Sequence, residues 1–403
     1  MLSQRQLFLD HLGQTSDFPL MLQVERAEGV YMYSAEEKRY LDLISGIGVS
    51  NVGHRHPKVL QAIQEQLDHY LHLMVYGELV QSPQVQLAEA LAQTLPDPLS
   101  ACFFVNSGSE AIEGALKLAK RYTRRPNLVS CINAYHGSSH GALSVSGSEQ
   151  FKQGYRPLLP GISHIRFNRP EDFSQIDGQT AAVVVETVQG EAGVQVADSG
   201  YFQALRNHCD QVGALLILDE IQAGFGRTGT FWAFESYGVV PDILVAAKGM
   251  GGGMPIGAFI SSPEIMQVLK NNPILGHITT FGGHPVSAAA SLATLRVIQE
   301  EKLLEQVPAK AQLITEQLQH PAIQGIRRRG LMMAVEFESF DMLKPIIDRA
   351  IELGVLTDWF LYCDNAMRVA PPLTIQEKEL NEACDIILQA IDDVLVGADH
   401  YDY

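Results

Sequence analysis

Six short runs of apolar and β-branched residues alternate with helix-patterned segments through the middle of this 403-residue chain. Strands that are buried on both faces have continuous apolar sequences, and helices between them indicate a largely parallel sheet. The sequence therefore predicts an α/β fold with a mostly parallel central sheet flanked by helices. The predicted strands are 102–105, 128–132, 181–185, 215–218, 243–246 and 257–260.

The two ends of the chain have a different pattern, in which a hairpin and a strand are combined with helices. These expected elements are a hairpin at 29–43, helices at 287–304 and 377–396, and a strand at 330–337. We expect both ends to build one smaller α+β domain. The predicted division is 1–52 for the first part of the small domain, 53–290 for the large domain, and 291–403 for a linking helix and the rest of the small domain.

The charge balance and the cysteines limit the classes of partner and the compartment. Acidic residues outnumber basic residues by 46 to 29, which gives a formal net charge of −17. Such a surface repels phosphate backbones and anionic headgroups, so we expect neither nucleic acid nor a membrane as a partner. The five cysteines are an odd set without C-x-x-C spacing, and the amino end has no signal pattern. We therefore expect reduced thiols in a cytoplasmic protein.

A loop rich in Ser and Gly, 106–110, follows the first predicted strand of the sheet and opens a helix. Unpaired N–H groups and the partial positive charge of a helix N-terminus make such a loop a potential phosphate site. The alternative is a capping box in which Ser107 and Glu110 only terminate the helix. The loop matches neither the dinucleotide-binding nor the P-loop pattern, so a nucleotide site has little support.

Lys248 and Asp219 each follow a buried strand of the predicted sheet. A desolvated lysine amine has a lowered pKa and can form a Schiff base with an aldehyde. The carboxylate can hold a positive charge, and both groups are expected at the carboxyl edge of the sheet, where ligands gather in open α/β folds. The alternatives are a lysine that extends into solvent and an aspartate that caps the next helix.

A phosphate site, a reactive lysine and an aspartate together match the three binding groups of pyridoxal 5′-phosphate (PLP). Its phosphate would bind the helix N-terminus, its aldehyde Lys248, and its protonated ring nitrogen Asp219. Tyr135 and His136, which follow another predicted strand, could supply a flat ring to stack on the pyridine. Packing of these rings in the core is the alternative.

These motifs resemble those of the class III aminotransferases, which are PLP enzymes of the fold type I architecture. The resemblance extends from about Gly29 to Leu373, and its most specific part is the segment 218–258. It implies a ping-pong transfer of an amino group from an ω-amino donor, such as acetylornithine or ornithine, to 2-oxoglutarate. Relatives that use 4-aminobutyrate or a diamine such as putrescine, and decarboxylases or aminomutases with the same cofactor, are the alternatives.

The resemblance also implies a role for individual residues. Lys248 matches the lysine that binds the cofactor aldehyde and moves the substrate proton, and Asp219 matches the acid that keeps the pyridine nitrogen protonated. Gln222 matches the residue that is hydrogen-bonded to the ring oxygen. The positions that match the cofactor site are Ser107, Gly108, Ser109, Tyr135, His136, Glu186, Asp219, Gln222, Lys248 and Thr280.

Four matched positions bear on the substrate and the assembly. Thr280 resembles the threonine that reaches the phosphate of the neighbouring subunit, which implies a homodimer with shared sites. Arg368 resembles the arginine that grips a substrate carboxylate and otherwise pairs with Glu191. Ser138 departs from the family, because acetylornithine and ornithine enzymes usually have an arginine there. In those enzymes the arginine holds the far carboxylate of glutamate or 2-oxoglutarate, and a hydroxyl cannot replace a guanidinium. Either another basic residue covers that carboxylate or the preferred substrates differ.

Three other functions compete with this assignment. The glycine loops could serve a nucleotide-dependent oxidoreductase, and the fold could be a catalytically silent scaffold, although the latter does not explain why both Lys248 and Asp219 are present. Two histidine pairs, 54/56 and 136/140, could indicate a metal, but no third ligand accompanies them at a suitable spacing. We therefore predict no metal site.

Overall fold

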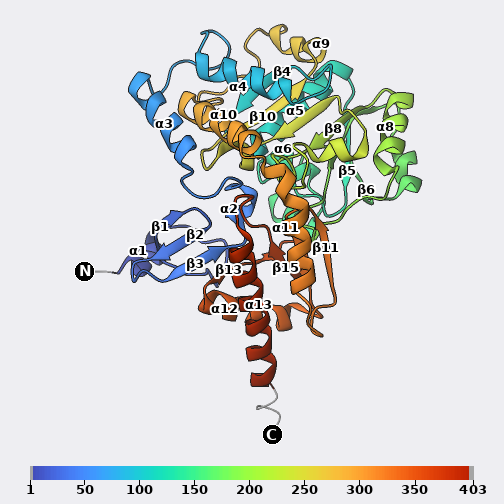
Figure 1. Cartoon of the computed structure of the whole chain (residues 1–403). Helices are drawn as coiled ribbons and strands as arrows, with labels where there is room; N and C mark the ends of the chain where they lie inside the picture. Colours follow the sequence, from blue (N-terminus) through green and yellow to red (C-terminus); the bar gives the residue numbers. More distant parts are fainter. Residues whose placement is uncertain (1–2, 399–403) are drawn as a thin grey trace.

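The computed structural model describes residues 3–398, which form a larger and a smaller lobe (Figure 1). A seven-stranded sheet with the order β4-β10-β9-β8-β7-β5-β6 lies in the larger lobe. Its strands are parallel except β10, which is antiparallel to both β9 and β4. The strands are β4 (Ala101–Val105), β5 (Asn127–Cys131), β6 (Ile162–Ile165), β7 (Thr180–Glu186), β8 (Leu215–Asp219), β9 (Ile243–Ala246) and β10 (Gly257–Ser261).

The predicted α/β class and the six predicted strands of the sheet are confirmed, and β6 is an additional edge strand that the prediction missed. Side chains along β7 alternate between two buried clusters. Ala182 and Val184 belong to the cluster that contains the apolar face of α5, whereas Val183 and Val185 belong to the cluster that contains α8. Because both faces are covered, the strands need apolar residues at every position.

Helices cover the sheet and carry the chain from one strand to the next (Figure 1). In the larger lobe they are α3 (Pro57–His69), α4 (Ser82–Gln93), α5 (Gly108–Thr123), α6 (His140–Val145), α7 (Glu149–Lys152), α8 (Tyr201–Val212), α9 (Pro263–Met266) and α10 (Pro285–Glu300). Short 3₁₀ helices are η1 (Gln153–Tyr155), η2 (Pro170–Gln175), η3 (Ala233–Tyr237), η4 (Lys248–Gly251) and η5 (Gln267–Lys270).

The smaller lobe contains two four-stranded sheets with the orders β1-β2-β3-β13 and β11-β12-β15-β14. Strand β13 is parallel to β3, with Val355 opposite Leu41, so the two ends of the chain share a sheet. The domain boundaries that the sequence analysis placed after residues 52 and 290 stay a prediction. The elements are β1 (Val24–Glu28), β2 (Tyr31–Ser34), β3 (Arg39–Asp42), β11 (Gly325–Arg329), β12 (Met332–Glu336), β13 (Val355–Leu356), β14 (Trp359–Phe360), β15 (Cys363–Val369), α1 (Gln4–His11), α2 (Ser45–Gly48), α11 (Leu303–Gln317), α12 (Phe340–Leu353) and α13 (Glu377–Ala398).

The single helix predicted at 287–304 is wrong, because the chain forms two helices there. Helix α10 ends at Glu300, Lys302 has the left-handed φ of 51°, and α11 begins at Leu303. This bend turns the chain from the larger lobe into the smaller one (Figure 1). Packing of α10 on α3 and α4 and of α11 on α13 therefore overrides the local helix propensity.

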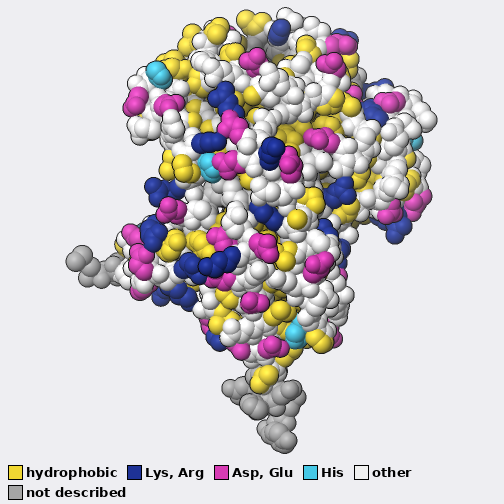
Figure 2. Space-filling model, viewed as in Figure 1, with side chains coloured by type: hydrophobic (Ala, Val, Ile, Leu, Met, Phe, Trp, Pro, Cys, Tyr) yellow, Lys and Arg dark blue, Asp and Glu magenta, His cyan; other side chains and the backbone are white. Residues whose placement is uncertain are grey.

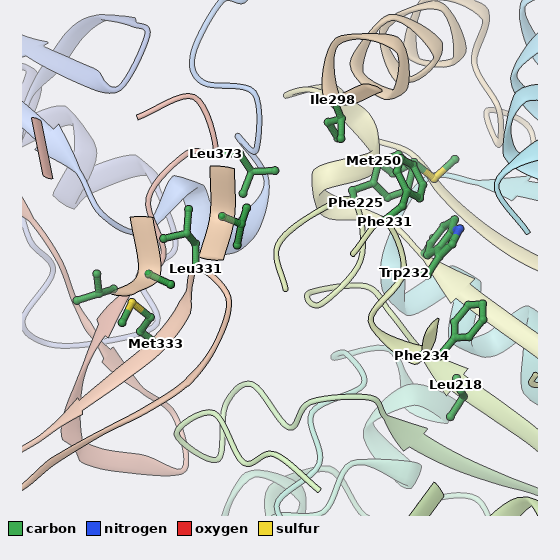
Figure 3. Packing of buried hydrophobic residues seen from close by; sticks show 14 of the residues in the cluster. Leu218, Phe225, Phe231, Trp232, Phe234, Met250, Ile298, Leu331, Met333 and Leu373 are labelled. Atoms are coloured by element: carbon green, nitrogen blue, oxygen red, sulfur yellow. The ribbon is translucent and has the colours of Figure 1, made fainter. Parts of the chain in front are cut away.

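Buried apolar side chains join the two lobes. Phe225, Phe231 and Met250 lie near Ile298 on one side of the joint, and Leu331 and Leu373 lie on the other (Figure 3). The buried guanidinium of Arg227 crosses the joint, since it donates hydrogen bonds to the carbonyl of Leu331 (3.2 Å) and to Oδ1 of Asn51 (2.6 Å). The lobes therefore pack as one core, and the site described next lies beside this joint.

The outer surface carries charges of both signs. On the face shown in Figure 2, acidic and basic side chains are interspersed over both lobes. Among the helices within residues 3–398, none combines the length and the apolar character that a membrane span requires.

Candidate active site

A cavity of about 400 Å³ opens at the carboxyl edge of the central sheet. This volume is in the range of small-molecule sites. Lys248 and Asp219 both line it, as do most other predicted site residues. The predicted residues in its wall are Ser107, Gly108, Ser109, Tyr135, His136, Glu186, Asp219, Gln222 and Lys248.

Lys248 begins the 3₁₀ helix η4, just after β9 ends at Ala246. Its φ is 49°, and the next residue is a glycine whose added Cβ would lie 2.4 Å from Nδ2 of Asn51. The side chain is partly buried, and burial lowers the pKa of its amine. Its Nζ forms no ion pair with a carboxylate among the described residues. Burial therefore shifts this amine, which lines the cavity, toward its neutral, nucleophilic form.

Asp219 ends strand β8 and is buried. Its Oδ2 lies 2.7 Å from Nδ1 of His136, and its Oδ1 accepts a hydrogen bond from the N–H of Ile221 at 2.9 Å. Nε2 of His136 lies 3.2 Å from Oγ of Ser130. The carboxylate therefore orders the turn after the strand, and it also faces the cavity beside an imidazole. The alternative that Asp219 caps the next helix is wrong, because residues 221–228 form a turn and η3 begins only at Ala233.

The N-terminus of α5 forms another wall of the cavity. Oγ of Ser107 accepts a hydrogen bond from the N–H of Glu110 at 3.2 Å, so Ser107 is the N-cap. The carboxylate of Glu110 accepts from the N–H of Asn106 rather than from that of Ser107, so the capping box is incomplete. The N–H groups of Gly108 and Ser109 lie in the first helical turn, where they have no intrahelical acceptor. These groups can bind an anion.

Tyr135 and Glu186 are joined at the back of the cavity. Oε1 of Glu186 accepts from the N–H of Tyr135, and Oε2 accepts from the N–H of Gly190, both at 2.9 Å. Burial raises the pKa of Glu186 to about 7. The ring of Tyr135 is half-buried in the cavity wall, and its centroid lies 6.5 Å from that of Tyr362.

Glu191 and Arg368 lie behind the cavity wall rather than in it. The guanidinium donates to both carboxylate oxygens, from Nη1 at 3.1 Å and from Nη2 at 2.9 Å. Burial alone would raise the pKa of Glu191, but the charge of Arg368 holds it below its usual value. Nε2 of Gln222 donates to Oε1 of Glu191 at 3.2 Å, which connects this buried pair to the cavity.

Ser138 and Thr280 also lie outside the lining. Ser138 is exposed, its N–H donates to Oγ of Ser109 at 3.1 Å, and its hydroxyl lies 3.4 Å from that of Tyr135. Thr280 is exposed, and its carbonyl accepts a hydrogen bond from Nε2 of His72 at 2.7 Å.

Within residues 3–398, no group of three or more His, Cys, Asp or Glu side chains could hold a metal ion.

Sequence reasoning missed several residues of the site. Asn106 lies in the predicted loop 106–110 but was given no role in the site, and the apolar lining residues Val188, Ile221 and Met254 carry no chemical signal of their own. Asp358, whose Oδ1 lies 2.8 Å from Nε of Arg368, was also missed. Its pairing becomes visible only in the fold, although the two residues are ten positions apart in the sequence.

Comparison with known proteins gives consistent results. The family described as aminotransferase class-III matches residues 13–391. The acetylornithine aminotransferases of Methanopyrus kandleri and Bacillus subtilis are each 37% identical to this chain, over 386 and 377 residues. The alignments cover 94% and 92% of this chain and 96% and 95% of the two relatives. An ornithine aminotransferase from Toxoplasma gondii, described with partial occupancy of PLP at its active site, superposes with a TM-score of 0.90 at 27% identity and covers 97% of this chain and 93% of its own.

Proposed function

The chain belongs to the class III aminotransferases, and we propose that it moves the amino group of an ω-amino donor to 2-oxoglutarate by a ping-pong cycle. Enzymes of this family use PLP, and the residues around the cavity fit that cofactor. When bound, PLP supplies an aldehyde that reacts with amines and a ring that withdraws electrons. The observation that carries the proposal is that Lys248 and Asp219 line one cavity together with the N-terminus of α5.

We assign the cofactor contacts from this arrangement. The N–H groups of Gly108 and Ser109 would bind the phosphate, since Ser107 fixes the start of α5. The carboxylate of Asp219, which is oriented by its hydrogen bond with His136, would balance the positive charge on a protonated ring nitrogen. Tyr135, Gln222 and Glu186, which line the same cavity, would supply the remaining contacts.

Lys248 has two roles in this proposal. In its neutral form the amine would bind the cofactor aldehyde, and once released Nζ would take the proton from the substrate carbon that bears the amino group. The lowered pKa of this amine supports both roles, because only the neutral form can attack a carbonyl or accept a proton. The same Nζ returns the proton on the other half of the cycle.

The pair of Glu191 and Arg368 decides which end of a substrate can enter. While Glu191 covers the guanidinium, an amine end without an adjacent carboxylate is favoured, and when Glu191 moves away the guanidinium can hold the carboxylate of a 2-oxo acid. One buried pocket can therefore serve an ω-amine and glutamate in turn. This supports 2-oxoglutarate as the acceptor.

The acetylornithine aminotransferases to which this chain is similar favour N-acetylornithine or ornithine as the donor. Ser138 supports a second candidate, because its hydroxyl leaves no guanidinium for a far carboxylate. The diamine putrescine, which has no carboxylate, is therefore the alternative that Ser138 favours, while 4-aminobutyrate keeps a far carboxylate and stays the other alternative. We further propose that the enzyme acts in the cytoplasm, which its five free cysteines support.

A screen of donors against acceptors tests this proposal. The purified PLP-loaded enzyme is incubated with N-acetylornithine, ornithine, 4-aminobutyrate or putrescine, each with 2-oxoglutarate or pyruvate. We expect glutamate to form in equal amount to the aldehyde from the donor, and only with 2-oxoglutarate. Release of CO₂ or an isomerised amine without an acceptor would instead identify a decarboxylase or an aminomutase.

A further inference from the structure

The guanidinium of Arg368 is held at two separate edges. Its Nη1 and Nη2 atoms donate to Glu191, whereas its Nε donates to Oδ1 of Asp358 at 2.8 Å. The ring of Phe360 covers one face, with its centroid 4.3 Å from Cζ. A guanidinium can bind a second carboxylate through Nη1 and Nη2 without losing a partner at Nε. Asp358 therefore does not compete for the edge that a substrate carboxylate would use.

Asp358 and Arg368 are also tied together through the backbone. The N–H of Arg368 donates to the carbonyl of Asp358 at 2.8 Å, and Oγ1 of Thr357 donates to the carbonyl of Arg368 at 2.7 Å. The carboxylate of Asp358 thus moves with the strand that carries Arg368. It is one-quarter exposed and also lines a separate cavity of about 740 Å³ beside α1, so the charge is partly hydrated there.

Glu191 and Asp358 occupy different edges of Arg368 and come from different parts of the chain. Glu191 lies on the loop that follows β7, and besides Arg368 its carboxylate accepts hydrogen bonds from Nε2 of Gln222 and from the N–H of Leu361, each at 3.2 Å. These two bonds are at the long end of the normal range. A substrate carboxylate that binds Nη1 and Nη2 would take the place of Glu191, whereas Asp358 at Nε would stay.

We propose that Asp358 is a positioning residue that keeps Arg368 in place when Glu191 moves away, so that Nη1 and Nη2 remain directed at an incoming carboxylate. This inference rests on the proposed function. Without Asp358, the buried Nε would lose its acceptor, and the long side chain of Arg368 could follow Glu191 or rotate. Misplacement of a binding group by a small distance weakens the step that depends on it.

The test uses three variants of the PLP-loaded enzyme. Asp358→Ala removes the acceptor, and Asp358→Asn keeps an acceptor oxygen but removes the charge. Asp364→Ala is the control, because it removes an exposed carboxylate from β15, the strand that also carries Arg368. Each variant is titrated with glutarate, an unreactive dicarboxylate of the length of 2-oxoglutarate, and its two half-reactions are measured separately by stopped flow.

We expect Asp358→Ala to weaken the binding of glutarate and of the acceptor 2-oxoglutarate about tenfold each, since a hydrogen bond to a charged group is lost. The half-reaction with N-acetylornithine should change less than twofold, because Glu191 stays on Arg368 there. The dissociation constant for glutarate in Asp358→Asn should stay within about threefold of the wild-type value. The dissociation constant in Asp364→Ala should equal that of the wild type.

Three results would overturn the inference. The first is an unchanged affinity for glutarate in Asp358→Ala. The second is an equal effect of Asp358→Ala on the donor and the acceptor half-reactions. The third is an Asp358→Asn variant that binds glutarate as weakly as Asp358→Ala does. The last would mean that charge rather than the hydrogen bond carries the effect. If the wild-type enzyme converts no amine donor, the proposed function fails, but the glutarate titration still decides the role of Asp358.

Discussion

At the scale of single residues, position 138 is where this chain departs from the pattern expected for acetylornithine and ornithine enzymes. Ser138 is exposed, and its hydroxyl lies 3.4 Å from that of Tyr135, which lines the cavity. A hydroxyl there offers one weak contact to a carboxylate, whereas a guanidinium offers two parallel charged hydrogen bonds. The residue therefore sets how strongly a far carboxylate contributes to binding.

We predict that Ser138→Arg strengthens the binding of N-acetylornithine and of 2-oxoglutarate by about tenfold each, seen as a lower KM. One charged hydrogen bond of roughly 1.5–3 kcal/mol would account for a change of that size. Putrescine, which has no carboxylate, serves as the control and should bind no better. Steady-state kinetics with each donor would check this. An equal gain for putrescine would contradict a role of position 138 in carboxylate binding.

Lys248 should make the loading of the cofactor depend on pH. Burial lowers the pKa of this amine from the usual lysine value of 10.5. The amine therefore loses its proton at a lower pH than an exposed lysine does. We expect the rate at which apoenzyme binds PLP, followed by absorbance, to rise with pH and to level off before pH 10.5. Lys248→Ala should lose the bound-cofactor absorbance and lower turnover by roughly 10³-fold or more. A rate that climbs steadily through pH 10.5 would contradict a lowered pKa.

The sequence predicted the residues with distinctive chemistry better than their neighbours. Asp219 ends one buried strand and Lys248 follows another by two residues, so each places an ionisable group beside an apolar run, and this contrast is visible in a single sequence. Val188 and Ile221 line the same cavity, but an apolar residue near a strand end looks like any core residue. Asp358 meets Arg368 only because two strands bring them together, and no local pattern reports that contact.

At the scale of secondary-structure elements, the contact between the loop after β5 and the start of α5 shapes the phosphate end of the cavity. Gly137 has a φ of +125°, and a Cβ added to it would lie 2.0 Å from Oγ of Ser109 and 3.1 Å from its Cα. Only glycine allows both the backbone conformation and this close approach. The position of the helix N-terminus therefore depends on this residue.

We predict that Gly137→Ala weakens PLP binding at least tenfold by displacing the first turn of α5. Strain at this φ should also lower the free energy of unfolding of the apoenzyme by about 1–3 kcal/mol. Fluorescence titration with PLP and urea denaturation measure the two effects. Gly154→Ala is the matched control, because a Cβ there meets nothing within 4 Å. Wild-type PLP affinity in Gly137→Ala would show that the loop does not fix the helix.

Elements with a strong hydrophobic pattern were predictable, and the exceptions have physical causes. Strand β6 (Ile162–Ile165) lies at the edge of the sheet and is only partly buried, so its polar residues hide the strand pattern. The break between α10 and α11 contains no glycine or proline. Lys302 adopts the left-handed conformation because the two helices pack on different lobes, and that information is not local.

At the scale of the whole molecule, exposed apolar side chains gather around Thr280. Val80 is 95% exposed, Ile274 73% and Phe281 54%. The segments that carry them are adjacent, since the ring of His72 lies 4.8 Å from that of Phe281. Apolar surface of this kind is typical of an interface between protein chains, which supports the proposed homodimer with Thr280 near the partner's phosphate site.

We predict that the wild-type enzyme sediments as a dimer and that Val80→Asp shifts it toward monomer by placing a charge in the interface. Thr280→Ala should remain dimeric but bind PLP several-fold more weakly, because one hydroxyl contact to the phosphate is lost. Sedimentation velocity and PLP titration separate the two effects. A monomeric wild-type enzyme with full activity would contradict the proposed shared site.

The pairing of β3 with β13 has a consequence for synthesis on the ribosome. Residues 39–42 emerge early, but their partner strand at 355–356 is translated only after most of the chain. Until then, one edge of the amino-terminal sheet stays open, while the segments of the larger lobe are already available to fold. The nascent polypeptide must therefore complete its smaller lobe last, and a transcript truncated before codon 355 yields a product whose first sheet lacks its closing strand.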